Sequence, residues 1–123
     1  MLKEFKKVRQ DNDSFRRYFT DDMFDLYIWY NKDVKEIEGF QIIYDKREEN
    51  LHAFTWEKNE GTFHSGIDNE GWYNPSPILF KSELANKIDI AREFVKRAKN
   101  IDDKLVKMIA NKIVHYRNPQ NNK

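Results

Sequence analysis

The sequence predicts an α+β fold: an antiparallel β-meander of about four or five strands, with two C-terminal helices packed on one of its faces. Three observations predict it: period-two alternation in the middle of the chain, short turn-forming connections there, and helical periodicity in the last third. Parallel strands need long crossovers, so short connections favour antiparallel neighbours. We expect one domain over residues 1–118 and a polar tail over residues 119–123.

Residues 1–22 lack a clear alternation, and we expect a short helical segment there. Two sets of apolar residues have the spacing of a helix face, namely Leu2, Phe5 and Val8, and then Phe15, Tyr18 and Phe19. Arg16 and Arg17 stand among these rings, which suits contact with phosphate or nucleic acid. We favour instead ion pairs with Asp21, Asp22 and Asp25.

The strands are expected at residues 23–30, 37–44, 51–57 and 62–67. In the first of these, Phe24, Leu26, Ile28 and Tyr30 alternate with Asp25, Tyr27 and Trp29, and this alternation is typical of a half-buried strand. Gly61 ends a turn-forming Asn-Glu-Gly run and can take a positive φ, so we expect a hairpin between the last two strands.

The rest of the chain is a loop followed by two helices. The Pro- and Gly-containing loop over 68–77 precedes a short apolar run, Ile78 to Phe80, which suits an edge strand. Ser82 is the expected N-cap of the first helix, and Asn100 separates the two helices and could cap the second. The expected apolar stripes are Leu84, Ile88, Ala91, Phe94, Val95 and Ala98, and then Leu105, Met108, Ile109, Lys112, Ile113 and Tyr116.

Composition narrows the class of protein. The 123 residues include no Cys, which excludes disulfides, thiolate metal sites and a Cys nucleophile. The N-terminus has no apolar signal segment, and no apolar run reaches the length of a membrane span, so we expect a cytoplasmic protein with no membrane partner. Residues 1–80 have a net charge of −5 and residues 81–123 a net charge of +6, which we interpret as basic helices lying over an acidic sheet.

Several aromatic and polar segments resemble a group of small uncharacterised bacterial proteins. These segments are FRRYFTDDMFDLYIWY, GFQIIYD, FTW, the pair His64 and Asp68, and SPIL, within residues 15–80. The resemblance implies a bacterial, cytoplasmic protein of unknown function, and it implies no activity, ligand or catalytic residue.

The candidates for catalysis are His52, His64 and Asp68. A hairpin through Gly61 would place the two histidines on neighbouring strands, where Asp68 or Asp45 could complete a general-base pair or a metal site. Histidines in a sheet more often bind tyrosine hydroxyls or backbone groups, and no HExxH or His-x-His spacing is present. We therefore predict neither a bound metal nor a cofactor.

The candidates for binding are Trp29, Gln41, Trp56, Trp72 and Tyr73. We expect Trp29 and Trp56 to share one sheet face with Tyr27 and Tyr44. If the face is exposed, it is a platform for bases or for a partner, and if it is covered, it is core. Gln41 lies in the middle of a strand and either links two strands or faces a pocket. Trp72 and Tyr73 either plug the core or line a site.

Three functions remain open. The first is a small binding or interaction module that holds a protein or a small ligand on the sheet face or on the Trp72–Tyr73 loop. The second is a hydrolase or metal-dependent enzyme built around His52, His64 and Asp68. The third is nucleic-acid binding through the basic C-terminal helices, which we rank last because P-loop, dinucleotide and RNA-binding signatures are missing.

Overall fold

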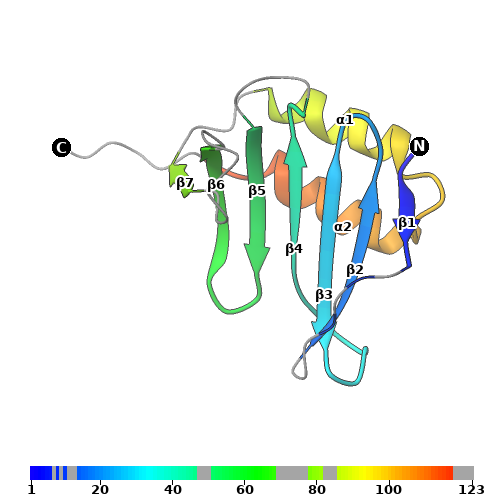
Figure 1. The fold of residues 1–123 in the computed structure, drawn as a ribbon. Coiled ribbons are helices and arrows are strands. Elements are labelled where there is room, and N and C mark those ends of the chain that lie inside the picture. Colours follow the sequence, from blue (N-terminus) through cyan, green and yellow to red (C-terminus); the bar gives the residue numbers. More distant parts are fainter. Residues whose placement is uncertain are drawn as a thin grey trace.

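A computed structural model describes residues 1–6, 8, 10, 14–46, 51–68, 78–81 and 86–117, and for 67–68 and 78–81 it describes the backbone alone. Its strands and helices are β1 (Lys3–Phe5), β2 (Ser14–Thr20), β3 (Asp25–Asn31), β4 (Ile37–Tyr44), β5 (Leu51–Glu57), β6 (Gly61–Asp68), β7 (Ile78–Lys81), α1 (Lys87–Arg97) and α2 (Asp103–Val114). The fold is α+β, with a seven-stranded sheet in the order β1 to β7, every neighbouring pair of which is antiparallel (Figure 1).

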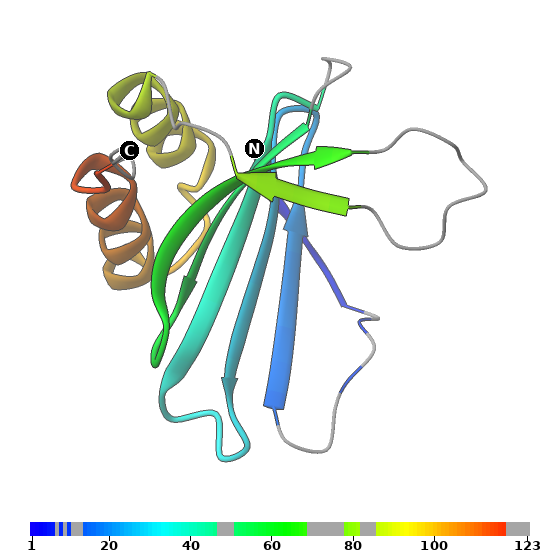
Figure 2. The same cartoon turned by 90° about the vertical axis from the view of Figure 1, so that its left-hand side faces the viewer.

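Both helices lie on the same side of the sheet, as the edge-on view shows (Figure 2). The strands turn alternate side chains toward them, so Leu26 and Ile28 of β3 and Phe40 and Ile42 of β4 are fully buried. From the helices, Phe94 meets Phe24 edge to face at 6.2 Å between ring centroids. The hydrophobic core is therefore the layer between one sheet face and the two helices.

The expectation of a helical N-terminal segment is wrong. Phe15, Tyr18 and Phe19 lie in β2, which pairs along its whole length with β3, and residues 3–5 form β1. Positions four apart, such as Phe15 and Phe19, share a face in a strand as well as in a helix, so their spacing did not discriminate. These two strands and β7 raise the count above the four or five expected.

The second helical stripe is confirmed, whereas the first is partly wrong. In α2, Leu105, Ile109 and Ile113 are buried. In α1, however, Ile88 is 56% and Val95 45% exposed, since the helix turns Ala91, Phe94 and Ala98 toward the sheet. Asn86 is the N-cap of α1, and the predicted cap Ser82 lies outside the described residues. The N-cap of α2 is Asp102 rather than the predicted Asn100.

The N-terminal edge strand is fixed to the turn between the helices. The backbone N–H of Leu2 donates to the Arg97 carbonyl at 2.9 Å, and the Asn100 side chain donates to the Leu2 carbonyl at 2.8 Å. The Arg97 guanidinium also donates to Asp21 at 3.1 Å and to Asp22 at 2.8 Å. These contacts hold α1 against the β2–β3 turn.

The expected ion pairs of the N-terminal segment are corrected by this arrangement. Arg17 pairs with Glu4 at 2.8 Å rather than with an aspartate of the turn. Asp21 and Asp22 pair with Arg97, and Asp25 pairs with Lys46 at 2.8 Å. The aspartates bind cations far along the chain, which a reading of local sequence cannot reveal.

We expect Phe94→Ala to lower the free energy of unfolding by about 3–5 kcal/mol, because Phe94 is 0% exposed and its removal leaves a cavity. The matched control is the next residue of the same helix, Val95→Ala, which should change stability by less than about 0.5 kcal/mol because Val95 is 45% exposed. Urea unfolding followed by circular dichroism measures both. Equal losses for the two variants would contradict the orientation of α1.

The Asp21 carboxylate should make stability depend on acidity. Partial burial would raise its pKa, but hydrogen bonds from the Phe24 and Met23 backbone and the Arg97 guanidinium outweigh burial, and the pKa of Asp21 is lowered. A lowered pKa stabilises the fold above the unfolded value of about 3.9 and loses that contribution as the pH falls below it. We expect Asp21→Asn to lose less stability than the wild type between pH 7 and pH 3 in urea titrations.

The control for this measurement is Asp103→Asn, at a carboxylate that is 80% exposed and paired with Lys107 in α2. Solvent screens such a pair, so this variant should follow the wild type across the same pH range. If Asp21→Asn followed the wild type as well, the hydrogen bonds to Asp21 would not contribute to acid sensitivity.

Candidate functional site

One face of the sheet lies opposite the helices (Figure 2). The strand register sets ordered rows of side chains on this face. Side chains directly opposite each other on neighbouring strands share a face. One row across β2 to β5 consists of Arg16, Trp29, Gly39 and Glu57. The next row, from β1 to β6, consists of Phe5, Tyr18, Tyr27, Gln41, Thr55 and Phe63. We call this surface the open face, because neither α1 nor α2 covers it.

A cavity of about 520 Å³ lies on the open face. Its lining side chains come from four neighbouring strands and are Ser14, Arg16, Tyr27, Trp29, Gln41, Ile43 and Glu57. The volume lies within the range of small-molecule sites, and a few polar groups among apolar and aromatic side chains are typical of such sites. It is therefore the candidate functional site.

Trp29 lines this cavity, and its indole lies against Gly39, its cross-strand neighbour. A Cβ atom at position 39 would come within 2.6 Å of Cε2 and Cζ2 of the indole, so only glycine leaves room for the ring. The indole thus lies along the sheet toward β4 and occupies the space where a side chain of residue 39 would stand. The indole is the aromatic group of the cavity on which a planar ligand could stack.

Tyr27 also lines the cavity, and neighbouring side chains fix the position of its ring. Its ring stacks on Tyr18 at 4.7 Å between centroids with an interplanar angle of 19°. The Tyr18 hydroxyl donates to Asp25 at 3.0 Å, and Lys46 donates to the same carboxylate oxygen at 2.8 Å. Partial burial, and then the nearby Tyr18 and Asp25, raise the pKa of the Tyr27 hydroxyl, so it stays neutral at physiological pH.

Gln41 links two strands and also lines the cavity. Its Nε2 donates to the Thr55 hydroxyl at 3.0 Å, and Thr55 is 3% exposed. A side-chain amide has a second N–H and a carbonyl oxygen for further hydrogen bonds. The orientation of Gln41 is thus fixed by one contact, while its lining position makes it a polar group for a ligand.

The expectation that the aromatic residues share a face is wrong. Tyr27 and Trp29 lie on the open face, whereas Tyr44 is buried in the core and Trp56 packs against that core on the helix side. The Lys112 ammonium of α2 lies 4.7 Å from the centroid of the Trp56 ring. Trp29 pairs with Gly39 and Trp56 pairs with Phe40, and these consecutive residues of β4 lie on opposite faces, so the two tryptophans do too.

The two histidines do lie on neighbouring strands and on the helix side of the sheet. Their rings stack with centroids 5.5 Å apart, and the His52 ring also stacks on Tyr44 at 5.3 Å. The Tyr44 hydroxyl and Nε2 of His64 are hydrogen-bonded at 2.5 Å, and Nδ1 of His52 lies 3.0 Å from Asp45. Burial and the Asp45 charge raise the pKa of the Tyr44 hydroxyl. Each ring therefore has an internal structural partner.

Other expected sites have less support. Among the described residues, no group of three or more His, Asp and Glu side chains could hold a metal ion. The Asp68 side chain and the residues Trp72 and Tyr73 lie outside what the structure describes. Within the described chain, no helix is long and apolar enough to cross a membrane.

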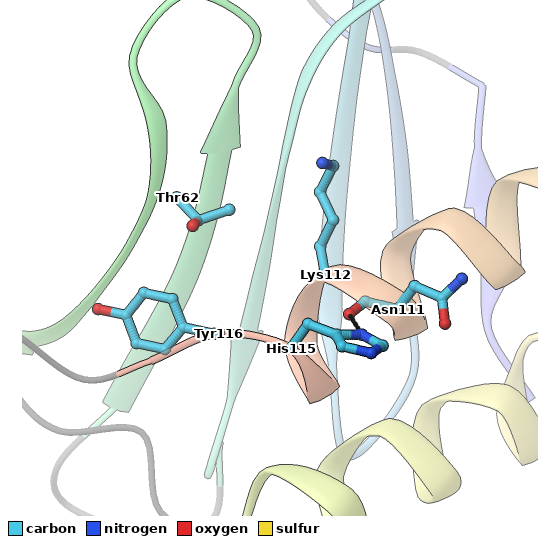
Figure 3. Close-up of a pocket in the computed structure, with 5 residues that line it drawn as sticks. All are labelled: Thr62, Asn111, Lys112, His115 and Tyr116. Carbon is cyan, nitrogen blue, oxygen red and sulfur yellow. Dashed lines mark hydrogen bonds between the residues drawn. The ribbon is translucent and has the colours of Figure 1, made fainter.

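A second cavity, of about 360 Å³, lies beside the C-terminal end of α2 (Figure 3). It is lined by Thr62, Asn111, Lys112, His115 and Tyr116. Several of these groups already have structural contacts: Lys112 is over Trp56, His115 Nδ1 bonds the Asn111 carbonyl at 2.9 Å, and Tyr116 packs against Phe54. We therefore regard the open-face cavity as the stronger candidate.

Sequence reasoning named Trp29 and Gln41 but missed Ser14, Ile43, Glu57 and the role of Gly39. The available signal was the lone glycine inside a strand next to one rich in aromatic residues. Finding Glu57 needed the register of two strand pairs, β3 with β4 and β4 with β5, which places it one strand beyond Gly39. Comparisons of the chain with family models, with curated proteins and with solved structures found no match, so the resemblance to small bacterial proteins stays a prediction.

We expect Gly39→Ala to displace the Trp29 indole and to destabilise the fold by about 1–3 kcal/mol, the usual range for overpacking. The new methyl group would also press on the Trp56 carbonyl oxygen, at 2.6 Å. A double-mutant cycle with Trp29→Ala separates the two contacts, since the substitution at position 39 should be less destabilising without the ring. Urea unfolding gives the four stabilities, and an equal effect in both backgrounds would rule out the ring contact.

Proposed function

We propose that this protein is a small ligand-binding module whose site is the cavity on the open face. The observation that carries the proposal is the indole of Trp29, which lies against Gly39 and lines a 520 Å³ cavity. Apolar rings packed in the core need no further explanation, whereas an aromatic ring lining a cavity on the side of the sheet that α1 and α2 do not cover does. A planar ligand would bury apolar surface there.

The polar residues of the cavity support a ligand with hydrogen-bonding groups. Gln41 is oriented by Thr55, so its remaining amide groups need no reorganisation when a ligand binds. Tyr27 is braced by the stack with Tyr18 and by the Asp25–Lys46 pair behind it. Preorganised side chains on strands hold a site more accurately than side chains on loops. We infer a planar ligand that stacks on Trp29 and bonds to Gln41.

The hydrolase and nucleic-acid hypotheses have less support from the described residues. His64 is buried, with its Nε2 bonded to Tyr44, and the His52 ring stacks on both that tyrosine and His64. This arrangement suits a packed structural cluster. The helices have basic residues, but two of those cations, Arg97 and Lys107, are paired with acidic groups.

Binding of planar probes tests the proposal. We expect indole, benzamide and adenine, titrated into ¹⁵N-labelled protein, to shift amide resonances of Tyr27, Trp29, Gln41 and Ile43 first. Trp29→Ala should weaken the binding of each probe that binds by at least about tenfold, because stacking on one aromatic ring is worth roughly 1–3 kcal/mol. The matched control is Trp56→Phe on the opposite sheet face, which should leave probe affinity unchanged.

Two results would contradict the proposal. One is that none of the three probes shifts the open-face resonances at millimolar concentration. The other is that Trp56→Phe weakens binding as much as Trp29→Ala, which would place the site on the helix side. Retained dispersion in the spectra of both variants shows that a loss of binding is not a loss of fold.

A further inference from the structure

Two opposite charges stand on either side of the Trp29 indole in the cavity. Arg16 lies on β2, directly across from Trp29, and Glu57 lies on β5, directly across from Gly39. Both charged side chains line the cavity together with the indole. A ligand resting on the ring would therefore have a cationic side chain toward β2 and an anionic one toward β5.

The separation of these groups is set by the sheet. Three strand spacings divide the backbones of residues 16 and 57, which is about 14 Å at the usual 4.7–4.9 Å per spacing. Gly39 has no side chain, and the indole fills the position above it, so no charged group of that row stands between the two ends. The row thus has a positive end, an aromatic middle and a negative end.

The positive end is anchored at its backbone. The Gln10 side chain donates to the Arg16 carbonyl at 2.9 Å and accepts from the Arg16 N–H at 2.7 Å, which fixes the strand at this point. A guanidinium has five N–H donors in a planar fork that matches a carboxylate, so it can engage a ligand together with a protein group.

We propose that the ligand of this site is a zwitterion with a planar body and opposite charges at its two ends. Its carboxylate would lie at Arg16, its ring on Trp29, and its ammonium group at Glu57. This inference rests on the proposed function, because it specifies the ligand class of the same cavity. Complementary charges at both ends discriminate against ligands with a single charge, since each of those leaves one cavity charge without a ligand partner.

Four matched probes with one benzene ring test the charge requirement: 4-(aminomethyl)benzoate, 4-methylbenzoate, 4-methylbenzylamine and 4-methylbenzyl alcohol. At pH 7 these are respectively a zwitterion, an anion, a cation and a neutral molecule. We expect the zwitterion to bind at least about tenfold more tightly than each of the other three, as measured by NMR titration at low salt.

Neutralising each end should remove one half of this preference. Arg16→Gln should weaken the zwitterion and the anion by about tenfold and leave the cation unchanged, whereas Glu57→Gln should weaken the zwitterion and the cation and leave the anion unchanged. A charge-swapped variant, Arg16→Glu with Glu57→Arg, should recover most of the affinity for the zwitterion, with the ligand reversed. Glu60→Gln, at an exposed glutamate in the following turn, is the control and should change none of the four affinities.

The outcomes separate the two proposals. If all four probes shift the open-face resonances with equal affinity, the cavity binds planar ligands but the zwitterion inference is wrong. The same conclusion follows if the cation alone binds as tightly as the zwitterion, since attraction to the indole and Glu57 would then suffice. If none of the probes binds, and indole, benzamide and adenine also fail, the proposed function fails with it.

Discussion

The contact between the Trp29 indole and the backbone of Gly39 is the constraint on which the open face depends. A side chain at position 39 would collide with the ring. The indole can therefore keep its position on β3 only while the paired position of β4 is glycine. Glycine alone destabilises a strand, because it has no side chain to pack and loses more conformational entropy on folding than other residues do. The cross-strand ring compensates by covering the exposed backbone. The same arrangement leaves the Trp29 ring between the cation of Arg16 and the anion of Glu57 in the cavity.

The two sheet faces serve different purposes because two helices can cover only one of them. On the helix side, Phe40, Phe54 and Phe94 are fully buried, and the histidines and Tyr44 form a packed cluster at the end of that layer. On the other side, Tyr18, Tyr27 and Trp29 are half-buried, and stacking and side-chain hydrogen bonds between neighbouring strands organise this face. Stability therefore resides mainly in the first layer, whereas the second presents partly exposed side chains that a ligand can contact.

The sequence was sufficient for the α+β class, for the four central strands and for the α2 stripe, because alternation and short turns are local signals. It was insufficient for β1 and β2, because the three-residue spacing of Leu2 and Phe5 favours a helix and the four-residue spacing of Phe15 and Phe19 fits a helix as well as a strand. The faces of Trp29 and Trp56 also escaped prediction, since they depend on which residues of β4 the two tryptophans pair with, namely Gly39 and Phe40. Among the site residues, Trp29 and Gln41 were identified from their chemistry, whereas Glu57 joins them only through the pairing of β3, β4 and β5.

The nuclear Overhauser spectrum of the free protein tests the central claim most directly, because it reports which protons approach the Trp29 ring. Strong cross-peaks between the indole Hζ2 proton and the Gly39 Hα protons are expected, together with none between Trp29 and the buried side chains Phe94 and Ile109 of the helices. Cross-peaks from the Trp29 indole to either helix would place the ring in the core. They would contradict both the open face and the cavity built on it.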